Sequence, residues 1–194
     1  MDRSLELDLV ARLIRADGDA FEQIYETFHP RLFNFLARLS RRRDVAEDLV
    51  EETWLRVVTY APRLHPETRL APWLFTVARN LYVSYCRSRA LDYDTLAGPP
   101  LWSTPPSGPS PFEAAAAGEL QQRVEAALAT LPGPYREAML LIALEGLTPA
   151  EAAIVCSVSQ ETMRQRLKRA RGLLVRRLED TTAASVGVLK EVLP

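Results

Sequence analysis

The residues best suited to chemistry lie in the stretch 159–177, which is rich in arginine and has no acidic residue after Glu161. As a helix at 100° per residue, it places four apolar side chains in one stripe: Met163, Leu167, Ala170 and Leu174. The opposite side carries Arg164, Gln165, Lys168 and Arg169. Cations attract phosphates, and Arg, Lys and Gln can hydrogen-bond base edges in a DNA groove. Taken alone, the stretch is compatible with a DNA-reading helix or with a solvated basic helix.

The preceding residues favour the DNA-reading interpretation. Thr148 and Glu151 have the spacing of a capping box, and Pro149 stands at the first position of the helix that they would start. Four apolar residues, 152–155, complete that short helix, and a turn leads into the basic one. This spacing is typical of a helix-turn-helix. Ser157 occupies the turn, where glycine is commoner, so we expect some backbone strain there.

Composition favours a cytoplasmic binding protein over an enzyme. The 194 residues fit one or two domains, and the net charge is only −1, although acids gather in 44–52 and bases in 164–177. There are two cysteines and two histidines, and they have no zinc-ligand spacing, so we expect free thiols and no metal. The sequence has no phosphate-binding loop, no dinucleotide turn, no signal peptide and no membrane-spanning run. We therefore expect no cofactor, no catalysis and no membrane insertion.

Apolar periodicity predicts an all-α protein of two small helical domains. The predicted order is a helical domain at 1–91, a Pro-rich linker at 92–112, a second helical domain at 113–180 and a tail at 181–194. Pro30 marks either a kink or the first turn of a new helix. In the second domain we expect helices over 113–130 and 135–145 before the helix-turn-helix, and a tail that frays or forms a short helix.

An acidic helix is predicted from Asp44, which has capping-box spacing with Glu47, to about Tyr60. Its expected inner face is Val45, Leu49, Thr53 and Val57, and its outward acids are Asp48, Glu51 and Glu52. These acids either complement the helix dipole or face a basic partner.

A loop over 61–71 and a helix opened by Pro72 follow. The residues expected to point inward are Trp73, Leu74, Val77, Leu81 and Tyr85. Those expected to offer charge or hydrogen bonds are Arg79, Asn80, Ser84, Arg87 and Arg89. Aromatics interleaved with Arg and Asn fit single-stranded nucleic acid, where bases stack and phosphates pair with arginine. The alternative is an ordinary amphipathic helix whose aromatics fill the core.

The chain resembles a bacterial RNA polymerase sigma factor of the extracytoplasmic-function (ECF) type of the sigma-70 family. Four stretches carry the resemblance: Asp44 to Trp54, Trp73 to Asn80, Leu131-Pro132 with the apolar helix after it, and Gly146 to Arg171. They occur in the family's order, with the Pro-rich stretch between the second and the third, and cover most of the chain.

The resemblance implies a role for each surface. The helix 44–58, with Asp48, Glu51 and Glu52, would dock on the β′ clamp helices of core polymerase, and the second domain on the β flap. The segment 61–89 would read and melt the promoter −10 element through Arg63, Leu64, His65, Arg79, Asn80 and Arg87. Arg164, Gln165, Lys168 and Arg169 would read the −35 element. An anti-sigma factor is a further partner in many relatives.

Three positions depart from the family's pattern. The 61–71 loop has Leu64-His65-Pro66 where Phe-Arg-Gly is common, Ser157 replaces the usual turn glycine, and Glu161 replaces a common glycine. The preferred bases of this chain therefore do not follow from those of relatives.

Two other functions compete with this interpretation. A helix-turn-helix regulator that does not bind core polymerase is the main alternative, but the first half has no receiver-like alternation of strands and helices. A protein–protein adaptor would have a degenerate recognition helix, whereas this one is strongly basic.

Overall fold

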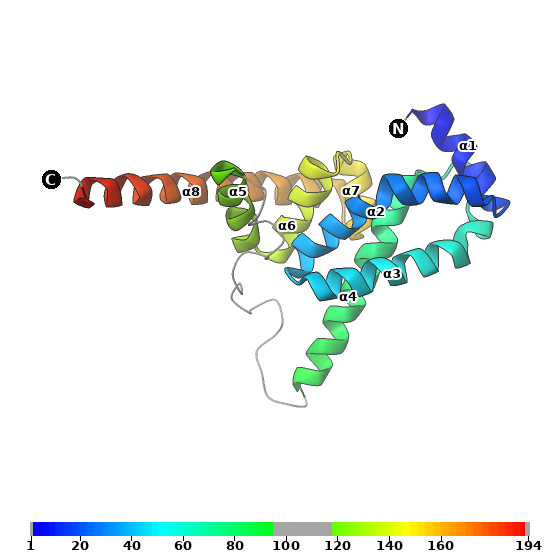
Figure 1. Ribbon diagram of the computed structural model, residues 1–194, viewed down its shortest axis with the longest axis horizontal. Coiled ribbons are helices and arrows are strands. Elements are labelled where there is room, and N and C mark those ends of the chain that lie inside the picture. Colours follow the sequence, from blue (N-terminus) through cyan, green and yellow to red (C-terminus); the bar gives the residue numbers. More distant parts are fainter. Residues whose placement is uncertain (1, 95–117, 193–194) are drawn as a thin grey trace.

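The computed structural model describes residues 2–94 and 118–192, and within these ranges the chain is all-α, as the sequence predicts (Figure 1). The first half contains α1 (Arg3–Ile14), α2 (Gly18–Ser40), α3 (Arg43–Tyr60), the 3-10 turn η1 (Ala61–Arg63) and α4 (Leu70–Asp94). The second half contains α5 (Glu119–Thr130), α6 (Gly133–Met139), the π-helical turn η3 (Leu140–Leu144), α7 (Pro149–Cys156) and α8 (Gln160–Val192).

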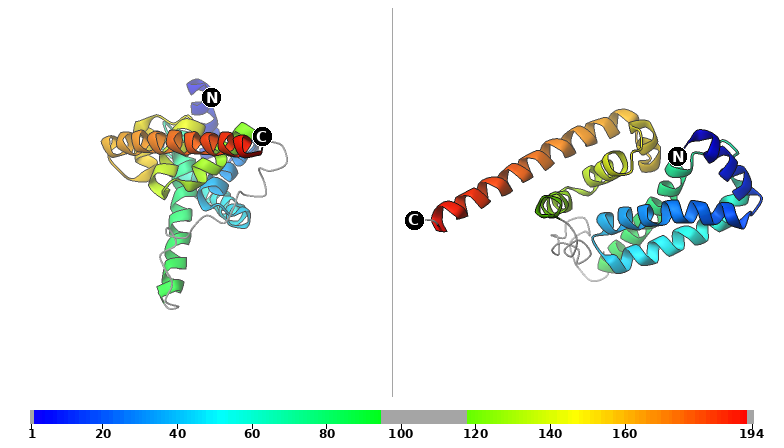
Figure 2. Two further views of the ribbon diagram at one scale, coloured as in Figure 1. Left: turned by 90° about the vertical axis from the view of Figure 1, so that its left-hand side faces the viewer. Right: turned by 45° about the horizontal axis from the view of Figure 1, so that its top comes forward.

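The predicted domain boundaries can be compared with the structure only in part, because it does not describe residues 95–117. Most of the predicted linker, 92–112, and the predicted start of the second domain at 113 lie outside the described residues. At its near end, α4 continues to Asp94, beyond the predicted end of the first domain. No break separates α8 from the predicted tail, because the helix runs past Thr181 to Val192. In Figure 1 and in the right view of Figure 2, the C-terminal part of α8 projects away from the rest of the molecule.

Pro30 lies inside α2, which is one continuous helix of 23 residues. No new helix therefore begins at Pro30. Both ends of α2 have local causes. The Asp17 carboxylate accepts a hydrogen bond from the Ala20 amide at 3.0 Å and caps the start. Arg41 adopts the left-handed conformation after the last turn, and its N–H donates to the Ala37 carbonyl.

The predicted capping box at Asp44 is wrong. Helix α3 begins one residue earlier, its N-cap is Arg42, and that residue makes no side-chain capping bond. The Asp44 carboxylate instead pairs with the Arg42 guanidinium, and Glu47 pairs with Arg43 at 2.7 Å. The two arginines that precede Asp44 thus bind the two carboxylates that would have formed the cap.

The first domain packs α3 and α4 against α2. All four residues predicted for the inner face of α3 are buried: Val45, Leu49, Thr53 and Val57. The three apolar ones join a cluster that includes Ile24, Phe28 and Leu32 of α2. The expected amphipathic pattern of α3 is therefore confirmed.

The predicted inner face of α4 needs correction. Leu74 is fully buried as expected, but Phe75 and Ala78 are fully buried as well. The other residues expected inside are only half-buried: Trp73, Val77, Leu81 and Tyr85. The physical reason is that α4 packs against three helices: α2 and α3 of the first domain and α7 of the second.

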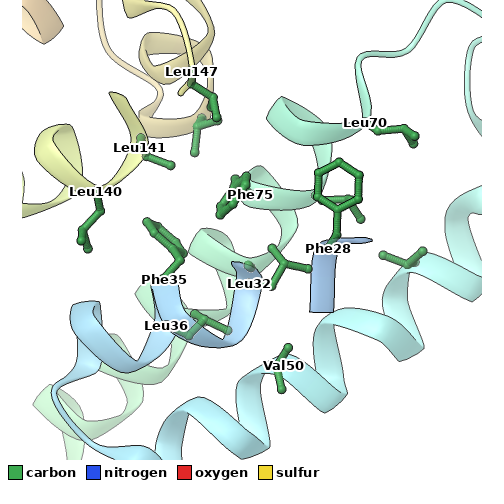
Figure 3. Close-up of a cluster of buried hydrophobic side chains, with 14 of the residues drawn as sticks. Phe28, Leu32, Phe35, Leu36, Val50, Leu70, Phe75, Leu140, Leu141 and Leu147 are labelled. Carbon is green, nitrogen blue, oxygen red and sulfur yellow. The ribbon is translucent and has the colours of Figure 1, made fainter. Parts of the chain in front are cut away.

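The two domains share one apolar core. The Phe35 and Phe75 rings meet edge to face with their centroids 5.2 Å apart. Leu140, Leu141 and Leu147 of the second domain belong to the same buried cluster, as Figure 3 shows. A smaller cluster holds α8 to α5 and α6 through Leu128, Met139 and Leu167. The second domain is thus seated on α2 and α4 of the first.

Candidate nucleic-acid interface

The helix-turn-helix begins with the predicted capping box. The Thr148 hydroxyl accepts from the Glu151 amide at 3.2 Å, and the Glu151 carboxylate accepts from the Thr148 amide at 2.9 Å. Ser157 then turns the chain with φ 53° and ψ 45°, a left-handed conformation that carries the expected strain. The Ser159 hydroxyl accepts from the Thr162 amide at 3.1 Å, which caps the start of α8.

The basic helix has the two faces that the sequence predicts. Of the predicted apolar stripe, Met163, Leu167 and Ala170 are buried and Leu174 is half-buried, whereas Arg164, Gln165, Lys168 and Arg169 are all exposed. Glu161 is also exposed and accepts from the Gln165 amide nitrogen at 3.1 Å. The Arg169 guanidinium reaches the Tyr135 hydroxyl at 3.4 Å. A row of exposed donors on a helix whose opposite face is buried can enter a major groove and bond base edges and phosphates.

A second candidate surface lies where α3 ends beside α4. A pocket of about 200 Å³ is lined by Arg56, Tyr60, Val77, Asn80, Leu81 and Ser84. Asn80 was predicted as a nucleic-acid contact, but Tyr60 was not. The exposed fraction of Tyr60 is 48%, so its ring offers a surface on which a base could stack. The feature of the sequence that could have identified Tyr60 is its position immediately before the predicted 61–71 loop.

The loop residues predicted with Asn80 do not line this pocket. Arg63 and His65 are exposed, and Leu64 is half-buried against the domain core. The loop is a compact turn in which His65 accepts from the Glu67 amide at 3.2 Å and from the Thr68 hydroxyl at 2.6 Å.

The two remaining candidates on α4 differ in access. Arg87 is exposed. The Arg79 guanidinium, by contrast, forms an ion pair with Glu137 of α6 at 3.1 Å, and its side chain is only 16% exposed. Arg79 is therefore not accessible in this structure, unlike Arg63, Asn80 and Arg87.

The acidic face of α3 continues into an apolar one. Asp48 and Glu51 are exposed, and Glu52 is half-buried and paired with Arg56 at 2.9 Å. Leu55 and Val58, which the sequence reasoning missed, are 64% and 57% exposed. They follow Glu51 at spacings of four and seven residues, so they share its face of the helix. That spacing was the signal that could have identified them.

Other kinds of site find little support in the parts of the chain that the structure describes. No group of three or more His, Cys, Asp or Glu side chains there could hold a metal ion. No helix within 2–94 or 118–192 is long and apolar enough to cross a membrane.

Two family models match this chain. The model for sigma-70 region 2 matches residues 24–91, and the model for sigma-70 region 4 matches residues 121–174. The chain is 33% identical to the ECF RNA polymerase sigma factor EcfG of Rhodopseudomonas palustris over 75% of its own length and 77% of that protein. It is also 33% identical to the RNA polymerase sigma factor CarQ of Myxococcus xanthus, over 78% of this chain and 84% of that one.

Solved structures with a similar fold include two complexes. The sigma factor RpoE in complex with the anti-sigma factor NepR, from Bartonella quintana, has a TM-score of 0.68 and 28% identity, and covers 82% of this chain and 96% of its own. CnrH in complex with the cytosolic domain of CnrY has a TM-score of 0.66 and covers 91% of this chain and 98% of its own. At 22% identity, the second likeness concerns the fold alone.

Proposed function

The chain belongs to the ECF sigma factors of the sigma-70 family, and from this premise we propose how its surfaces divide the work of promoter-directed transcription initiation. The first domain, 1–91, binds core polymerase and the −10 element. The second domain, 113–180, binds the −35 element. The segment 92–112 links them. Two domains that each bind DNA with moderate affinity then bind the promoter with high affinity when the spacing of its two elements fits.

The exposed basic face of α8 is the single observation that best supports this assignment. Arg164, Gln165, Lys168 and Arg169 are accessible, and Met163 and Leu167 anchor the helix from behind. We assign the four exposed side chains to the −35 element in the major groove. Their donors suit guanine edges and phosphates, and a bidentate contact to one base supplies about 1–3 kcal/mol of discrimination.

The pocket beside Asn80 supports a role in melting the −10 element. Extruding a base costs a few kcal/mol, which a pocket and a stacking ring must offset. Tyr60 offers the ring, and Asn80 and Arg56 offer hydrogen bonds inside a volume that fits a base. Arg63, Leu64 and His65 lie on the adjoining loop, and the exposed Arg87 on α4 supplies a cation for the backbone of the non-template strand. Arg79 can take the same role only where its ion pair with Glu137 is broken.

We assign core binding to Asp48, Glu51 and Glu52, with the exposed Leu55 and Val58 beside them. Charged side chains around an apolar centre are a common composition for a protein interface. The partners are the β′ clamp helices here and the β flap at the second domain. An anti-sigma factor is a further proposed partner, because the similar sigma factor RpoE of Bartonella quintana forms a complex with the anti-sigma factor NepR. The site of action is the cytoplasm, and the protein catalyses no reaction itself.

Run-off transcription tests the proposal. The protein and sigma-free core polymerase are combined on DNA from upstream of the protein's own gene, and we expect a transcript only when both are present. Arg164→Ala with Lys168→Ala should lower promoter affinity and its salt dependence but leave core binding intact. Arg176→Ala with Arg177→Ala, farther along α8, is the matched control. Unchanged promoter affinity in the first variant would remove α8 from the −35 contact.

The acidic face is tested separately. Glu51→Lys with Glu52→Lys should impair holoenzyme assembly and leave the −35 contact of α8 unchanged, because it reverses charge on α3 alone. Normal assembly would exclude those acids from the interface. If the unmodified protein bound DNA but not core polymerase, a helix-turn-helix regulator that acts without core would replace this proposal.

A further inference from the structure

The loop over 61–71 is tied to the N-terminal helix α1, which lies far from it in the sequence. The Glu6 carboxylate of α1 accepts a hydrogen bond from the Leu70 amide at 2.8 Å, across 64 positions of the chain. The Arg3 guanidinium donates to the Glu67 carbonyl at 2.8 Å. The turn η1, which opens the loop, also packs on α1 (Figure 1). Helix α1 therefore contacts the loop where it starts and where it ends.

Glu6 is a buried carboxylate at the centre of these contacts. The residue is 6% exposed, and its second oxygen pairs with Arg3 at 2.7 Å and with Arg69 at 3.1 Å. Leu70 is the first residue of α4, so its amide is one of the donors that the helix itself leaves without a partner. A carboxylate at that end also complements the helix dipole. Glu6 is thus held by three partners, and in turn it fixes the start of α4.

Helix α1 is a firm support for these contacts. Leu9, Val10 and Leu13 of α1 are buried in the core of the first domain. The groups that α1 holds at the Leu70 amide and the Glu67 carbonyl belong to the backbone of the loop and of the helix start. The side chains assigned to the −10 strand are left exposed between these anchors, at Arg63 and His65.

The support comes from within the first domain. The Arg69 guanidinium also lies 3.4 Å from Glu151 of α7, but its side chain is 56% exposed, and an exposed ion pair contributes little. The bonds from Arg3 and Glu6 to the loop backbone involve no residue of the second domain. The position of the loop is therefore set by α1.

We propose that Glu6 is a positioning residue for the −10 contact: it fixes the direction in which Arg63 and His65 face the strand. The inference rests on the proposed role of the 61–71 loop in that contact. Reading a base needs side chains held to within about 0.5 Å, and a loop reaches this precision only when its backbone is fixed by further hydrogen bonds. Loss of the contacts with α1 therefore lowers the discrimination between bases more than it lowers the binding of DNA in general.

The experiment uses holoenzyme assembled from the full chain and core polymerase. The probe is a fluorescein-labelled single-stranded DNA from the non-template −10 region upstream of the protein's own gene, with a series in which each position is replaced by each of the other bases. Fluorescence anisotropy gives the Kd of every oligonucleotide, and the ratio of the substituted Kd to the parent Kd measures discrimination. Binding of a duplex that carries the −35 element, and binding of core polymerase, report on the rest of the molecule.

Two variants loosen the loop by different routes. Glu6→Gln keeps an acceptor for the Leu70 amide but loses the charge that binds the arginines. Arg3→Gln removes the guanidinium that bonds the Glu67 carbonyl, and we expect it to fold because the Arg3 side chain is 41% exposed. Asp8→Asn is the matched control, since it removes a carboxylate from a side chain of α1 that is 59% exposed and pairs within the helix.

We expect Glu6→Gln and Arg3→Gln to lower the Kd ratio at least about fivefold at one or more −10 positions, which is the lower end of what a base contact contributes. The control should leave the ratio unchanged, and all three variants should bind the −35 duplex and core polymerase normally. An equal loss of affinity for every oligonucleotide, for the duplex and for core polymerase would mean that Glu6 only maintains the fold, and would overturn the proposal.

An unchanged ratio in both variants also overturns the proposal. In that case Arg63→Ala with His65→Ala separates it from the proposed function. A lower ratio in this loop variant would leave the loop as a −10 reader that needs no support from α1. An unchanged ratio would remove the loop from the −10 contact as well.

Discussion

Ser157 is a side-chain-bearing residue in a backbone conformation that favours glycine. Its φ of 53° is imposed by the turn between α7 and α8, where its own N–H donates to the Ile154 carbonyl at 3.1 Å. The hydroxymethyl group is exposed, so it gains no packing in return for the strain.

Ser157→Gly should therefore raise the free energy of unfolding by about 0.5–1 kcal/mol, because the left-handed region is open to glycine. Urea denaturation measures the change. Ser88→Gly is the contrast, because Ser88 is exposed and lies in the middle of α4. Glycine there should lower the free energy of unfolding by about 0.5–1 kcal/mol, since it weakens the helical backbone. Equal effects of the two substitutions would mean that the turn stores no strain.

A second residue-scale prediction concerns acid. The Arg12 guanidinium donates to the Asp17 carboxylate at 3.0 Å, and the Ala20 amide adds a bond; together they lower the pKa of Asp17 from 3.8 to about 2. Because the folded pKa lies below the unfolded one, the carboxylate stabilises the fold above about pH 4, and this contribution is lost as the pH falls towards 2.

Asp17→Asn keeps a capping oxygen but removes the titration. Between about pH 5 and pH 3, the urea midpoint of this variant should fall less than that of the unmodified protein. The exposed Asp19, replaced by Asn, is the control and should follow the unmodified protein. If Asp17→Asn fell equally far, the ion pair with Arg12 would contribute nothing to acid stability.

At the scale of the element, α7 depends on its first turn. The helix has only eight residues, which is too short to be stable by itself, and its N-terminus is closed by the reciprocal bonds of Thr148 and Glu151. The cap also fixes where the chain enters the helix-turn-helix.

Thr148→Ala should lower the free energy of unfolding by about 1 kcal/mol through loss of that cap. Thr59→Ala is a matched control, because its exposed hydroxyl bonds only the Leu55 carbonyl within α3, and it should change stability by less than about 0.5 kcal/mol. Thermal unfolding monitored by circular dichroism separates the two. If Thr148→Ala changed the free energy of unfolding by no more than Thr59→Ala, tertiary packing alone would stabilise α7.

The comparison of two sequence motifs shows what could be predicted at this scale. Thr148 and Glu151 form the expected capping box, and so confirm that prediction. Asp44 and Glu47 have the same spacing but do not, because the arginines beside them compete for the carboxylates. Apolar periodicity likewise predicted the buried stripe of α8, because this part of the helix is buried on one face only.

Sequence periodicity failed where two faces are buried. Phe75 lies against Phe35 and the second domain, a neighbour that no local pattern can show. The ion pairs between domains join residues up to 114 positions apart, so the loss of access at Arg79 was equally invisible. The exposed Tyr60, which completes the pocket, was missed because aromatic residues are assigned to cores by default.

At the scale of the whole molecule, the contact between domains predicts coupled unfolding. Arg38 and Glu125 form a two-pronged ion pair, with nitrogen–oxygen distances of 2.9 and 2.8 Å, and side chains that are 23% and 10% exposed. The pair joins residues 87 positions apart, and the two domains share one buried cluster.

A double-mutant cycle with Arg38→Gln and Glu125→Gln should give a coupling free energy of about 1 kcal/mol. The unfolding transition of the unmodified protein should be single, because neither domain can unfold without exposing the shared cluster. A coupling near zero, together with two separate transitions, would mean that the domains do not rest on each other in solution.

The unbroken course of α8 has a mechanical consequence. At 1.5 Å per residue, its 33 residues make a rod about 50 Å long. The base-reading side chains stand at one end of this rod, and its last turns extend beyond the body of the molecule (Figure 2). A partner that bound the far end and turned the rigid helix would therefore move Arg164 and Lys168 through the same angle, without touching DNA.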